Sequence, residues 1–440
     1  MNVTNEYARI SHHTLSLSVN PFTVPASSDF TDGTWTMYDL DISEIGTMED
    51  VPQAHIRIDS SILQIPLVSG PGTATQILTS NGDGTFSWSD ECCDAVIYEA
   101  GSAGTGSIKP ILNGDATGNY ATMSGGLDNI VTADYGTISG GKENTVSGLY
   151  SGIIAGEQNT VGGEHTFLGA GEQNIASGDY SFIGGGSLNT TSTIHTFVGG
   201  GTTNDASNNF SLVVGGSTNT ASAQYSSILG GLNHTASGTY GSIGGGTGNT
   251  ASAIYTTVGG GRTNVASASD ATVSGGTTNT ASATSATVVG GASAKANRYG
   301  QRAYAAGQFS TQGDSQQVDF VARTNTTDAT ATNLWLDGNS ARLTIPSGNI
   351  LAVTVNVAGI EDDGTEAAHY MRKVMIKNVG GTTSLVGAVQ TISTDVETSA
   401  GLDVTITADD TNDALDIKVT GLAATDMRWV CHVSGVEIIY

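Results

Sequence analysis

One stretch decides the fold: Asn219-Thr-Ala-Ser-Ala-Gln-Tyr-Ser-Ser-Ile-Leu-Gly-Gly-Leu-Asn233. The same pattern returns every 15 residues between Asn129 and Ala294, with His234 once in the Asn position. A Gly-Gly pair keeps the same period. Such a short fixed period is typical of a stacked solenoid rather than of a globular enzyme domain. The repeated Asn residues, which we take as the structural repeat positions, are Asn129, Asn144, Asn159, Asn174, Asn189, Asn204, Asn219, Asn249, Asn264 and Asn279.

Two apolar columns predict two short strands in each coil. One column runs from Ile138 to Val288, and the other runs from Val131 to Ala281. Gly-Gly is expected at one corner, because glycine tolerates positive φ. The Asn that follows is expected to tolerate a left-handed backbone and to form ladders from coil to coil. No proline lies between Pro110 and Pro346, which favours hydrogen-bonded coils.

The thinness of the coil predicts association along the rod. A coil this short has room for about two inward apolar side chains, too few to offset the ordering entropy of a lone roll. A symmetric bundle of three identical rolls would bury a common core. About twelve coils at ~4.8 Å each give a rod of roughly 55–60 Å.

The repeat unit Asn-Thr-Ala-Ser-(Ala/Gly)-x-Tyr-Ser-x-(Ile/Val)-x-Gly-Gly resembles the head repeats of trimeric YadA-like adhesins. It is also similar to the β-roll shafts of bacteriophage tail fibres. The resemblance covers residues 111–300 and implies a homotrimeric virion fibre. The segment 69–90, with its Asn-Gly-Asp-Gly turn, and the stretch from Leu334 to Val433 also resemble parts of phage fibre proteins.

The predicted fold class is therefore all-β. It consists of a small N-terminal β domain, a trimeric left-handed parallel β-roll (solenoid) shaft of 15-residue coils, and a C-terminal antiparallel β-sandwich. Residues 1–70 are expected to dock to the virion, and 71–110 to form a linker with a hairpin. The shaft is expected at 111–300, a neck at 301–345 and the C-terminal sandwich at 346–440.

Composition and charge exclude several partners. The chain has 15 Lys and Arg against 41 Asp and Glu, a net charge of −26, so it is a poor binder of nucleic acid or anionic membrane. No secretory signal and no apolar run of about 18 residues is found. These features argue against membrane insertion and favour a virion component assembled in the host cytoplasm. Reduced thiols are favoured for Cys92, Cys93 and Cys431, with an axial metal or inter-chain bond at the adjacent pair as the alternative.

Stacked acids are the best catalytic candidates. Glu157 and Glu172 share one column, and Glu164 and Asp179 share another, so adjacent coils bring carboxylates about 5 Å apart, as in retaining glycosidases. Solvated corner acids are the favoured interpretation, with weak cation binding and catalysis as alternatives. Two acidic loops, 361–364 and 409–413, lack EF-hand spacing and are read as turns. No Walker loop, zinc-type motif or nucleophile elbow appears, so we expect no enzyme, cofactor or metal site.

Two further columns leave alternatives open. An aromatic column is interpreted as packing over the seam of the roll, with an exposed glycan-stacking ladder as the alternative. A Thr column from Thr145 to Thr280 raises an ice-binding interpretation, but Ile175, Asp205 and Val265 interrupt it. The aromatic column consists of Tyr120, Tyr135, Tyr150, His165, Tyr180, His195, Phe210, Tyr225, Tyr240 and Tyr255.

The resulting hypothesis is a structural virion fibre subunit, a phage tail fibre that mediates host attachment. The homotrimer would dock to tail, baseplate or capsid proteins through its N-terminus. Its C-terminal domain would bind a host-surface glycan or protein receptor by multivalent adhesion. Tyr370, Trp429 and His369 are the candidate receptor contacts. The alternatives are a capsid (head) fibre or decoration protein, a tailspike-like glycan depolymerase and a cellular trimeric adhesin.

Overall fold

The computed structural model describes residues 114–440 and, before them, ten short strands. The chain divides into two compact units, Met1–Glu99 and Ala100–Tyr440. The described part of the chain consists of strands and turns, and it contains no helix able to cross a membrane.

The early strands pair locally. The pairs β1–β2, β3–β4, β5–β6 and β7–β8 are antiparallel, and the last pair is the hairpin expected around Asn81-Gly-Asp-Gly84. The rest of the expected docking domain, together with Cys92 and Cys93, lies outside the described residues. The strands are β1 (Ile10–Ser11), β2 (Thr14–Leu15), β3 (Phe30–Thr31), β4 (Thr34–Trp35), β5 (His55–Ile58), β6 (Ser61–Gln64), β7 (Ile77–Ser80), β8 (Phe86–Ser89), β9 (Tyr98–Ala100) and β10 (Ile108–Pro110).

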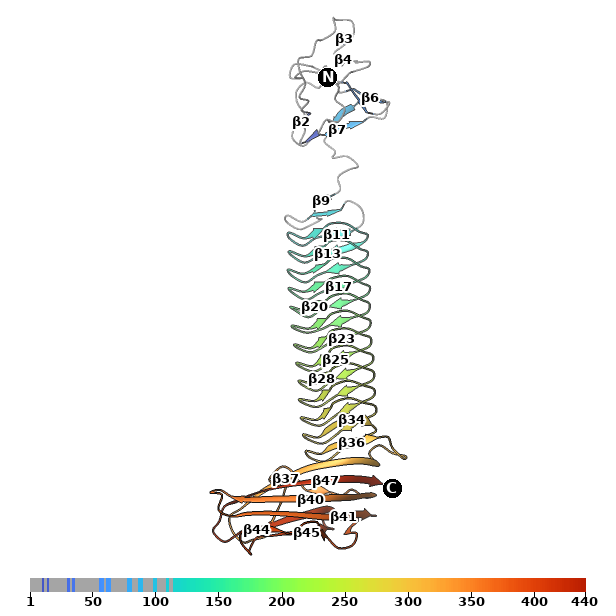
Figure 1. Ribbon diagram of the computed structural model, residues 1–440. Helices are drawn as coiled ribbons and strands as arrows, with labels where there is room; N and C mark the ends of the chain where they lie inside the picture. The colour runs from blue at the N-terminus through green and yellow to red at the C-terminus, as the bar shows by residue number, and fades with distance from the viewer. Residues whose placement is uncertain are drawn as a thin grey trace, which may run out of the picture. The chain divides into compact units, whose positions relative to one another are not determined.

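The repeat forms a parallel β-solenoid, which we call the shaft (Figure 1). Each coil contributes one strand to each of two parallel sheets, and partners along each sheet lie 15 residues apart. The first sheet, the Ala sheet, has 13 strands: β11 (Gly114–Ala116), β13 (Asn129–Val131), β15 (Thr145–Val146), β17 (Thr160–Val161), β19 (Ile175–Ala176), β21 (Thr190–Thr191), β23 (Asp205–Ala206), β25 (Thr220–Ala221), β27 (Thr235–Ala236), β29 (Thr250–Ala251), β31 (Val265–Ala266), β33 (Thr280–Ala281) and β35 (Lys295–Ala296).

The second sheet, the Ile sheet, lies across the core from the first. Its shaft strands are β12 (Thr122–Met123), β14 (Thr137–Ile138), β16 (Gly152–Ile153), β18 (Phe167–Leu168), β20 (Phe182–Ile183), β22 (Phe197–Val198), β24 (Leu212–Val213), β26 (Ser227–Ile228), β28 (Ser242–Ile243), β30 (Thr257–Val258), β32 (Thr272–Val273), β34 (Thr287–Ala292) and β36 (Arg302–Ala306).

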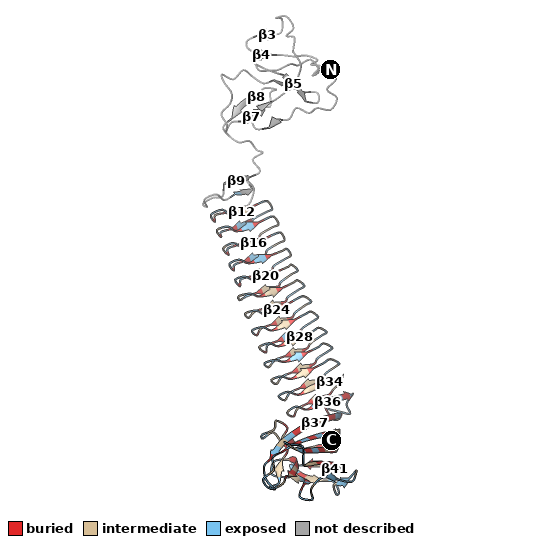
Figure 2. Cartoon of the chain, turned by 60° about the vertical axis from the view of Figure 1, so that its left-hand side comes forward, coloured by how far each residue is buried: buried red, intermediate tan, exposed pale blue. Residues whose placement is uncertain are grey.

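Alternation along each short strand explains why these residues form a coil. In β20, Phe182 points outward, while Ile183 points inward and is fully buried. In β25, Thr220 points outward and Ala221 is fully buried. Side chains alternate across a strand, so one inward residue per strand builds two apolar columns that meet in one cluster. Figure 2 shows buried residues, in red, recurring along the stacked coils.

This cluster closes within a single chain. Its members from both sheets, such as Ile228 and Ala236, have no exposed surface even without a second copy. The expectation that a lone roll buries too little surface to be stable, the number of associated chains and the handedness of the coils stay predictions.

The turns correct one detail of the expected backbone. The left-handed residues are the aromatic column, for example Tyr180 with φ 54°, and the residue just before each ladder Asn, for example Leu188 with φ 58°. Asn189 itself is not left-handed. It is fully buried instead, because its side chain hydrogen-bonds to the neighbouring coils.

The C-terminal domain is built from two antiparallel sheets that share one hydrophobic cluster. The larger sheet runs β37–β47–β40–β41 and ends with β42, β43 and β44. The smaller one joins β38, β39 and β45 to β46. The strands are β37 (Ser315–Thr326), β38 (Thr332–Asn333), β39 (Leu343–Thr344), β40 (Asn349–Glu361), β41 (Ala367–Val379), β42 (Thr382–Leu385), β43 (Gln390–Thr391), β44 (Val396–Glu397), β45 (Asp403–Asp409), β46 (Ala414–Thr420) and β47 (Met427–Ile439).

The Ile sheet continues without a break from the shaft into the larger C-terminal sheet. β36 pairs in parallel with β34 on one side and antiparallel with β37 on the other. β37, which falls in the range expected as a neck, then pairs along its whole length with β47. The predicted fold class is thus confirmed as an all-β chain with a parallel solenoid of 15-residue coils and an antiparallel C-terminal domain.

Candidate functional site

The buried Asn column forms a continuous hydrogen-bonded ladder. The backbone N–H of Asn204 donates to Asn189 Oδ1 at 3.0 Å. Asn189 Nδ2 donates to Asn174 Oδ1 at 3.1 Å, and to the carbonyls of Gly185 and Gly201 at 2.9 Å each. The predicted ladder is therefore confirmed, and its role is to satisfy buried backbone groups at the Gly corner.

The ladder ends where the chain leaves the shaft. Ala294 takes the Asn position and still donates its N–H to Asn279 Oδ1 at 2.9 Å. The residue one period later, Phe309, instead donates its N–H to Asp314 Oδ1 at 2.8 Å. Because no coil follows, position 294 needs no side chain that reaches onward.

His234 is the one imidazole in the ladder. The backbone N–H of His234 donates to Asn219 Oδ1, and its ring Nδ1 accepts from the backbone N–H of Asn249, each at 3.0 Å. Nδ1 must therefore be unprotonated. Burial lowers the pKa of His234, and contacts with the backbone of Gly246 and Asn249 oppose that shift only in part.

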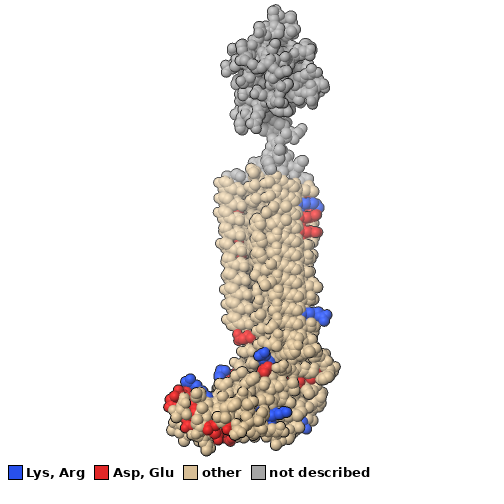
Figure 3. All heavy atoms as spheres, viewed as in Figure 1, with Lys and Arg blue, Asp and Glu red and all other residues tan. Residues whose placement is uncertain are grey.

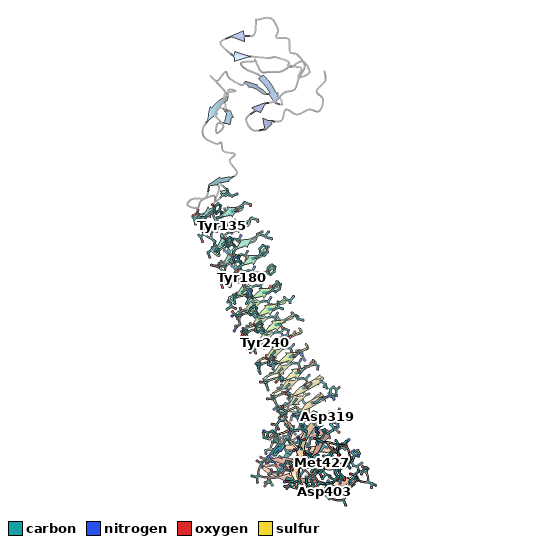
Figure 4. The ribbon with its side chains drawn as sticks, turned by 90° about the vertical axis from the view of Figure 1, so that its left-hand side faces the viewer. Tyr135, Tyr180, Tyr240, Asp319, Asp403 and Met427 are labelled. Atoms are coloured by element: carbon teal, nitrogen blue, oxygen red, sulfur yellow. The ribbon has the colours of Figure 1, made fainter. Side chains whose placement is uncertain are left out.

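The aromatic column is exposed, so the expectation that it covers a seam is wrong. Its rings stack face to face down the shaft, with centroids 4.7 Å apart for Tyr135 and Tyr150 and 4.8 Å apart for Tyr225 and Tyr240. Tyr255 is 53% exposed. Figure 4 shows Tyr135, Tyr180 and Tyr240 following one another down the shaft. Each interior ring has both faces covered by neighbouring rings, so it presents its edge rather than a free face for a sugar.

The stacked acids lie on the surface and are engaged locally. Glu157 Oε1 accepts from Lys142 Nζ at 2.7 Å. Asp179 Oδ1 accepts from the backbone N–H of Glu164 at 2.9 Å. Glu157 and Glu172 are neighbours in a ladder of single parallel bridges, as their common column predicts. Figure 3 shows that charged side chains are few on this view of the shaft and gather on the C-terminal domain.

The acidic loops of the C-terminal domain are turns closed by their own carboxylates. Asp409 Oδ1 accepts from the N–H groups of Thr411 and Asn412, and Asp363 Oδ1 accepts from Thr365 N–H. Among the residues described, no three His, Cys, Asp or Glu side chains gather as metal ligands would. Cys431 is a free, buried thiol, and burial raises its pKa to about 12.

Two of the three candidate receptor contacts are in the core. Tyr370 and Trp429 are each 1% exposed, so neither side chain reaches the surface of this chain. Trp429 Nε1 donates to Thr326 Oγ1, and the Tyr370 hydroxyl donates to Glu397 Oε2 at 2.8 Å. His369 is half-buried, and its Nε2 lies 2.8 Å from Asn356 Oδ1.

Tyr370 and His369 lie on β41, which pairs with the segment 386–401 that we call the distal segment. This segment contains β43 and β44, and it lies at the end of the larger sheet that is farthest in strand order from β36. It exposes Val386, Ile392 and Val396, the last at 63%. Arg372 pairs with Asp395 in a forked contact, and Tyr370 holds Glu397. Sequence reasoning selected Tyr370 and His369 but missed that they anchor this segment, because its strands β43 and β44 have only two residues each.

A buried polar cluster joins the shaft to the C-terminal domain. Arg298, in the turn after β35, pairs with Glu437 of β47, and both side chains are at most 3% exposed. Gln316 Nε2 donates to Glu437 Oε2 at 2.7 Å, and Asn349 donates to Oε1. Burial opposes ionisation of Glu437, but Arg298 and these hydrogen bonds outweigh it and hold its pKa below the ordinary value.

An open groove of about 490 Å³ lies beside this cluster. Tyr304, Phe309, Val436 and Ile438 supply its apolar lining. The loop bearing Phe309 is fixed by Asp314, whose carboxylate accepts three backbone N–H groups. Burial opposes the charge of Asp314, but the N–H groups of Ser310, Thr311 and Phe309 lower its pKa to about 2.

Comparison with known proteins gives structural likeness alone. No protein-family model and no curated protein matches the chain. It is similar in structure to the tailspike protein of Acinetobacter baumannii phage AM24, with 8% identity, a TM-score of 0.21, and coverage of 74% of this chain and 76% of that one. It is also similar to a tailspike protein of Acinetobacter baumannii bacteriophage Fri1, with 7% identity, a TM-score of 0.19, and coverage of 73% and 71%. At this level of similarity no residue role is carried over, and the resemblance to YadA-like heads is not confirmed.

One expectation from the sequence is corrected by this comparison. The Fri1 protein is described as a capsular polysaccharide depolymerase. The prediction from the sequence that this protein is not an enzyme is therefore wrong, because an enzyme is among the chains of similar structure.

Proposed function

We propose that this protein is a phage tail attachment protein, a virion fibre subunit that holds a host-binding domain at the end of a stiff shaft. The observation that carries the proposal is the junction. One sheet runs from the shaft into the C-terminal domain, and the buried Arg298–Glu437 pair fixes that domain to the last coil. A buried, fully hydrogen-bonded polar cluster specifies one orientation.

The stiffness of the shaft follows from its contacts. Each coil pairs with the next through two strands, a single-residue bridge and the Asn ladder. About thirteen coils at ~4.8 Å give a length of roughly 60 Å. Such a shaft keeps a binding domain away from its attachment point, which suits adhesion at a cell surface.

Host contact is assigned to the distal segment, with His369 beside it and Tyr370 as its buried anchor. Val386, Ile392 and Val396 are exposed there, at 42%, 48% and 63%. Exposed apolar side chains that lie close together are typical of interaction sites. The docking of residues 1–70 to the virion, the domain division given above and three chains per fibre belong to the same proposal, because multivalency converts weak contacts into avidity.

Binding of the full-length protein to host cells tests the proposal. Ile392→Asp and Val396→Asp should reduce the amount bound at least tenfold. Val379→Asp is the matched control, since Val379 and Ile392 are equally exposed at 48% and Val379 lies at the other end of β41 from His369. Unchanged binding of both distal variants would refute the assignment. Reducing ends released from capsular polysaccharide by the same protein would instead support the depolymerase alternative.

A further inference from the structure

The outer face of the Ile sheet carries an apolar belt at one height of the shaft. Each coil has two outward positions on this face, for example Phe182 and Gly184 on either side of buried Ile183. In six consecutive coils one or both positions are apolar and large. The apolar belt consists of Ile154, Phe167, Phe182, Phe197, Leu212, Val214 and Leu229.

Within the belt, a large residue at one position goes with a small one at the other in most coils. Phe182 is followed by Gly184, where a Cβ would lie 2.3 Å from the carbonyl oxygen of Gly199 in the next coil and 3.4 Å from the Phe182 ring. Gly152 is followed by Ile154. The coils on both sides of the belt place only Thr, Ser or Gly in the first position, as at Thr137 and Ser242. The belt is therefore a local feature that the solenoid itself does not require.

Four of the seven belt residues, Phe167 among them, are exposed, although they are apolar. Ile154 is 51% exposed, Val214 45% and Leu229 57%. The Phe rings stack on one another, with centroids 5.7 Å apart for Phe167 and Phe182 and 5.1 Å apart for Phe182 and Phe197. Stacking hides the ring faces that a sugar would use, and the seven belt side chains supply no donor or acceptor for its hydroxyls. An apolar protein surface is the better match.

The face around the belt carries no charge. From Thr122 to Val289, neither outward position of the Ile sheet holds Asp, Glu, Lys or Arg in any coil. Several other outward columns of the shaft do, with Asp134, Glu164 and Asp179 in one of them and Asp205 on the Ala sheet. A chain of net charge −26 repels its own copies wherever carboxylates meet. The Ile-sheet face is the side of the shaft on which copies can approach without that repulsion.

We propose that the apolar belt is the contact between copies of this chain, which pack along their Ile-sheet faces, parallel and in register. In that arrangement each belt meets an identical belt at the same height. An antiparallel arrangement of aligned shafts would place part of the belt against Thr, Ser and Gly coils, because the belt lies nearer the N-terminal end of the shaft. The inference deepens the fibre proposed above and rests on it for the number of chains.

The test replaces the belt by the shaft's own polar residues. The triple variant Phe167→Thr, Phe182→Thr and Phe197→Thr puts in each coil the residue that Thr137 and Thr257 already provide, so each chain should still fold. Light scattering should give a multiple of 44.6 kDa for the wild type and a lower multiple for the triple variant. Ile175→Thr is the control, because Ile175 is 46% exposed on the Ala sheet and Thr fills the same column in neighbouring coils.

Two results would overturn the proposal: a wild type of 44.6 kDa, or a triple variant with circular dichroism and mass like the wild type. Loss of cell binding without a change of mass would show instead that the belt contacts the host. Failure of the proposed fibre function can be distinguished from failure of the belt proposal, because it leaves a wild-type multimer that binds no cells.

Register is tested with nitroxide labels in a Cys92→Ser, Cys93→Ser background. Labels at Thr137→Cys and at Thr272→Cys, near the two ends of the face, should give the same short inter-copy distance. Long distances at both positions would refute the parallel arrangement.

Discussion

Removal of one Asn side chain from the middle of the ladder should destabilise the shaft measurably. In Asn189→Ala, the buried N–H of Asn204 loses its acceptor, and the carbonyl of Gly185 loses a donor. Gly201 O keeps the N–H of Ser187, and Asn174 Oδ1 keeps the N–H of residue 189. The orphaned N–H of Asn204 costs about 1–3 kcal/mol. The two amide hydrogens of Asn189, shared among Asn174 Oδ1 and the carbonyls of Gly185 and Gly201, are worth about 1 kcal/mol each. The expected loss is therefore about 3–5 kcal/mol of unfolding free energy.

Urea unfolding followed by far-ultraviolet circular dichroism, at one protein concentration, measures this loss. The midpoint should fall while the slope against urea stays constant. Thr190→Ala is the control, because Thr190 is the next residue and points outward from β21. A surface change of that kind is worth about 0.5 kcal/mol or less. If Asn189→Ala costs no more than Thr190→Ala, the ladder does not stabilise the shaft and the reasoning fails.

Three further predictions concern other parts of the same unit. His234→Asn should stabilise the protein most at acid pH. Because the folded pKa of His234 is lowered, the wild-type protein has its full stability above the unfolded pKa of 6.5 and loses stability as the pH drops below that value. Unfolding of wild type and variant at pH 8 and at pH 5 measures the difference. Glu437→Met should lower the free energy of unfolding by about 3–5 kcal/mol, because it leaves Arg298 buried and uncompensated. The double variant Arg298→Met with Glu437→Met should recover most of that free energy. Equal loss in the single and the double variant would contradict a coupled pair. Gly261→Ala should destabilise the shaft by more than about 2 kcal/mol, because its Cβ would lie 2.1 Å from Gly276 O at φ +91°. Gly248→Asn is the control, because Asn233 occupies the same left-handed column, and its stability should stay within about 0.5 kcal/mol of the wild type in the same urea assay.

The shaft could be predicted from the sequence because its contacts repeat at a fixed separation. Val146 and Val161 are 15 residues apart and pair in the Ala sheet, so a column read from the sequence is also a row of neighbours in space. The inward positions and the Asn ladder follow from that rule. The left-handed backbone at the turns could not be predicted in this way. Tyr and Gln adopt φ near 55° there, although the left-handed region usually favours Gly and Asn.

The candidate site was harder to predict, because its contacts cross the chain at long and irregular separations. Arg298 and Glu437 are 139 residues apart, and no local pattern relates them. Trp429 and Tyr370 were selected as aromatic residues of a binding domain, but alternation within β47 and β41 turns both toward the core. Exposure of the aromatic column was also missed, since a stacked column has the same sequence pattern whether it is covered or open.

A strict period has a consequence for how such a shaft changes over evolutionary time. Removal of one whole coil, for example residues 235–249, joins two coils that already have matching corners, ladder positions and inward residues. The shaft would shorten by about 4.8 Å and otherwise keep its pairing. Removal of seven residues would turn the pattern out of phase at every later coil. The length of the shaft therefore changes in steps of one coil. Duplication or loss of whole coils is a simple genetic route by which the shaft can be matched to a thicker or thinner surface layer.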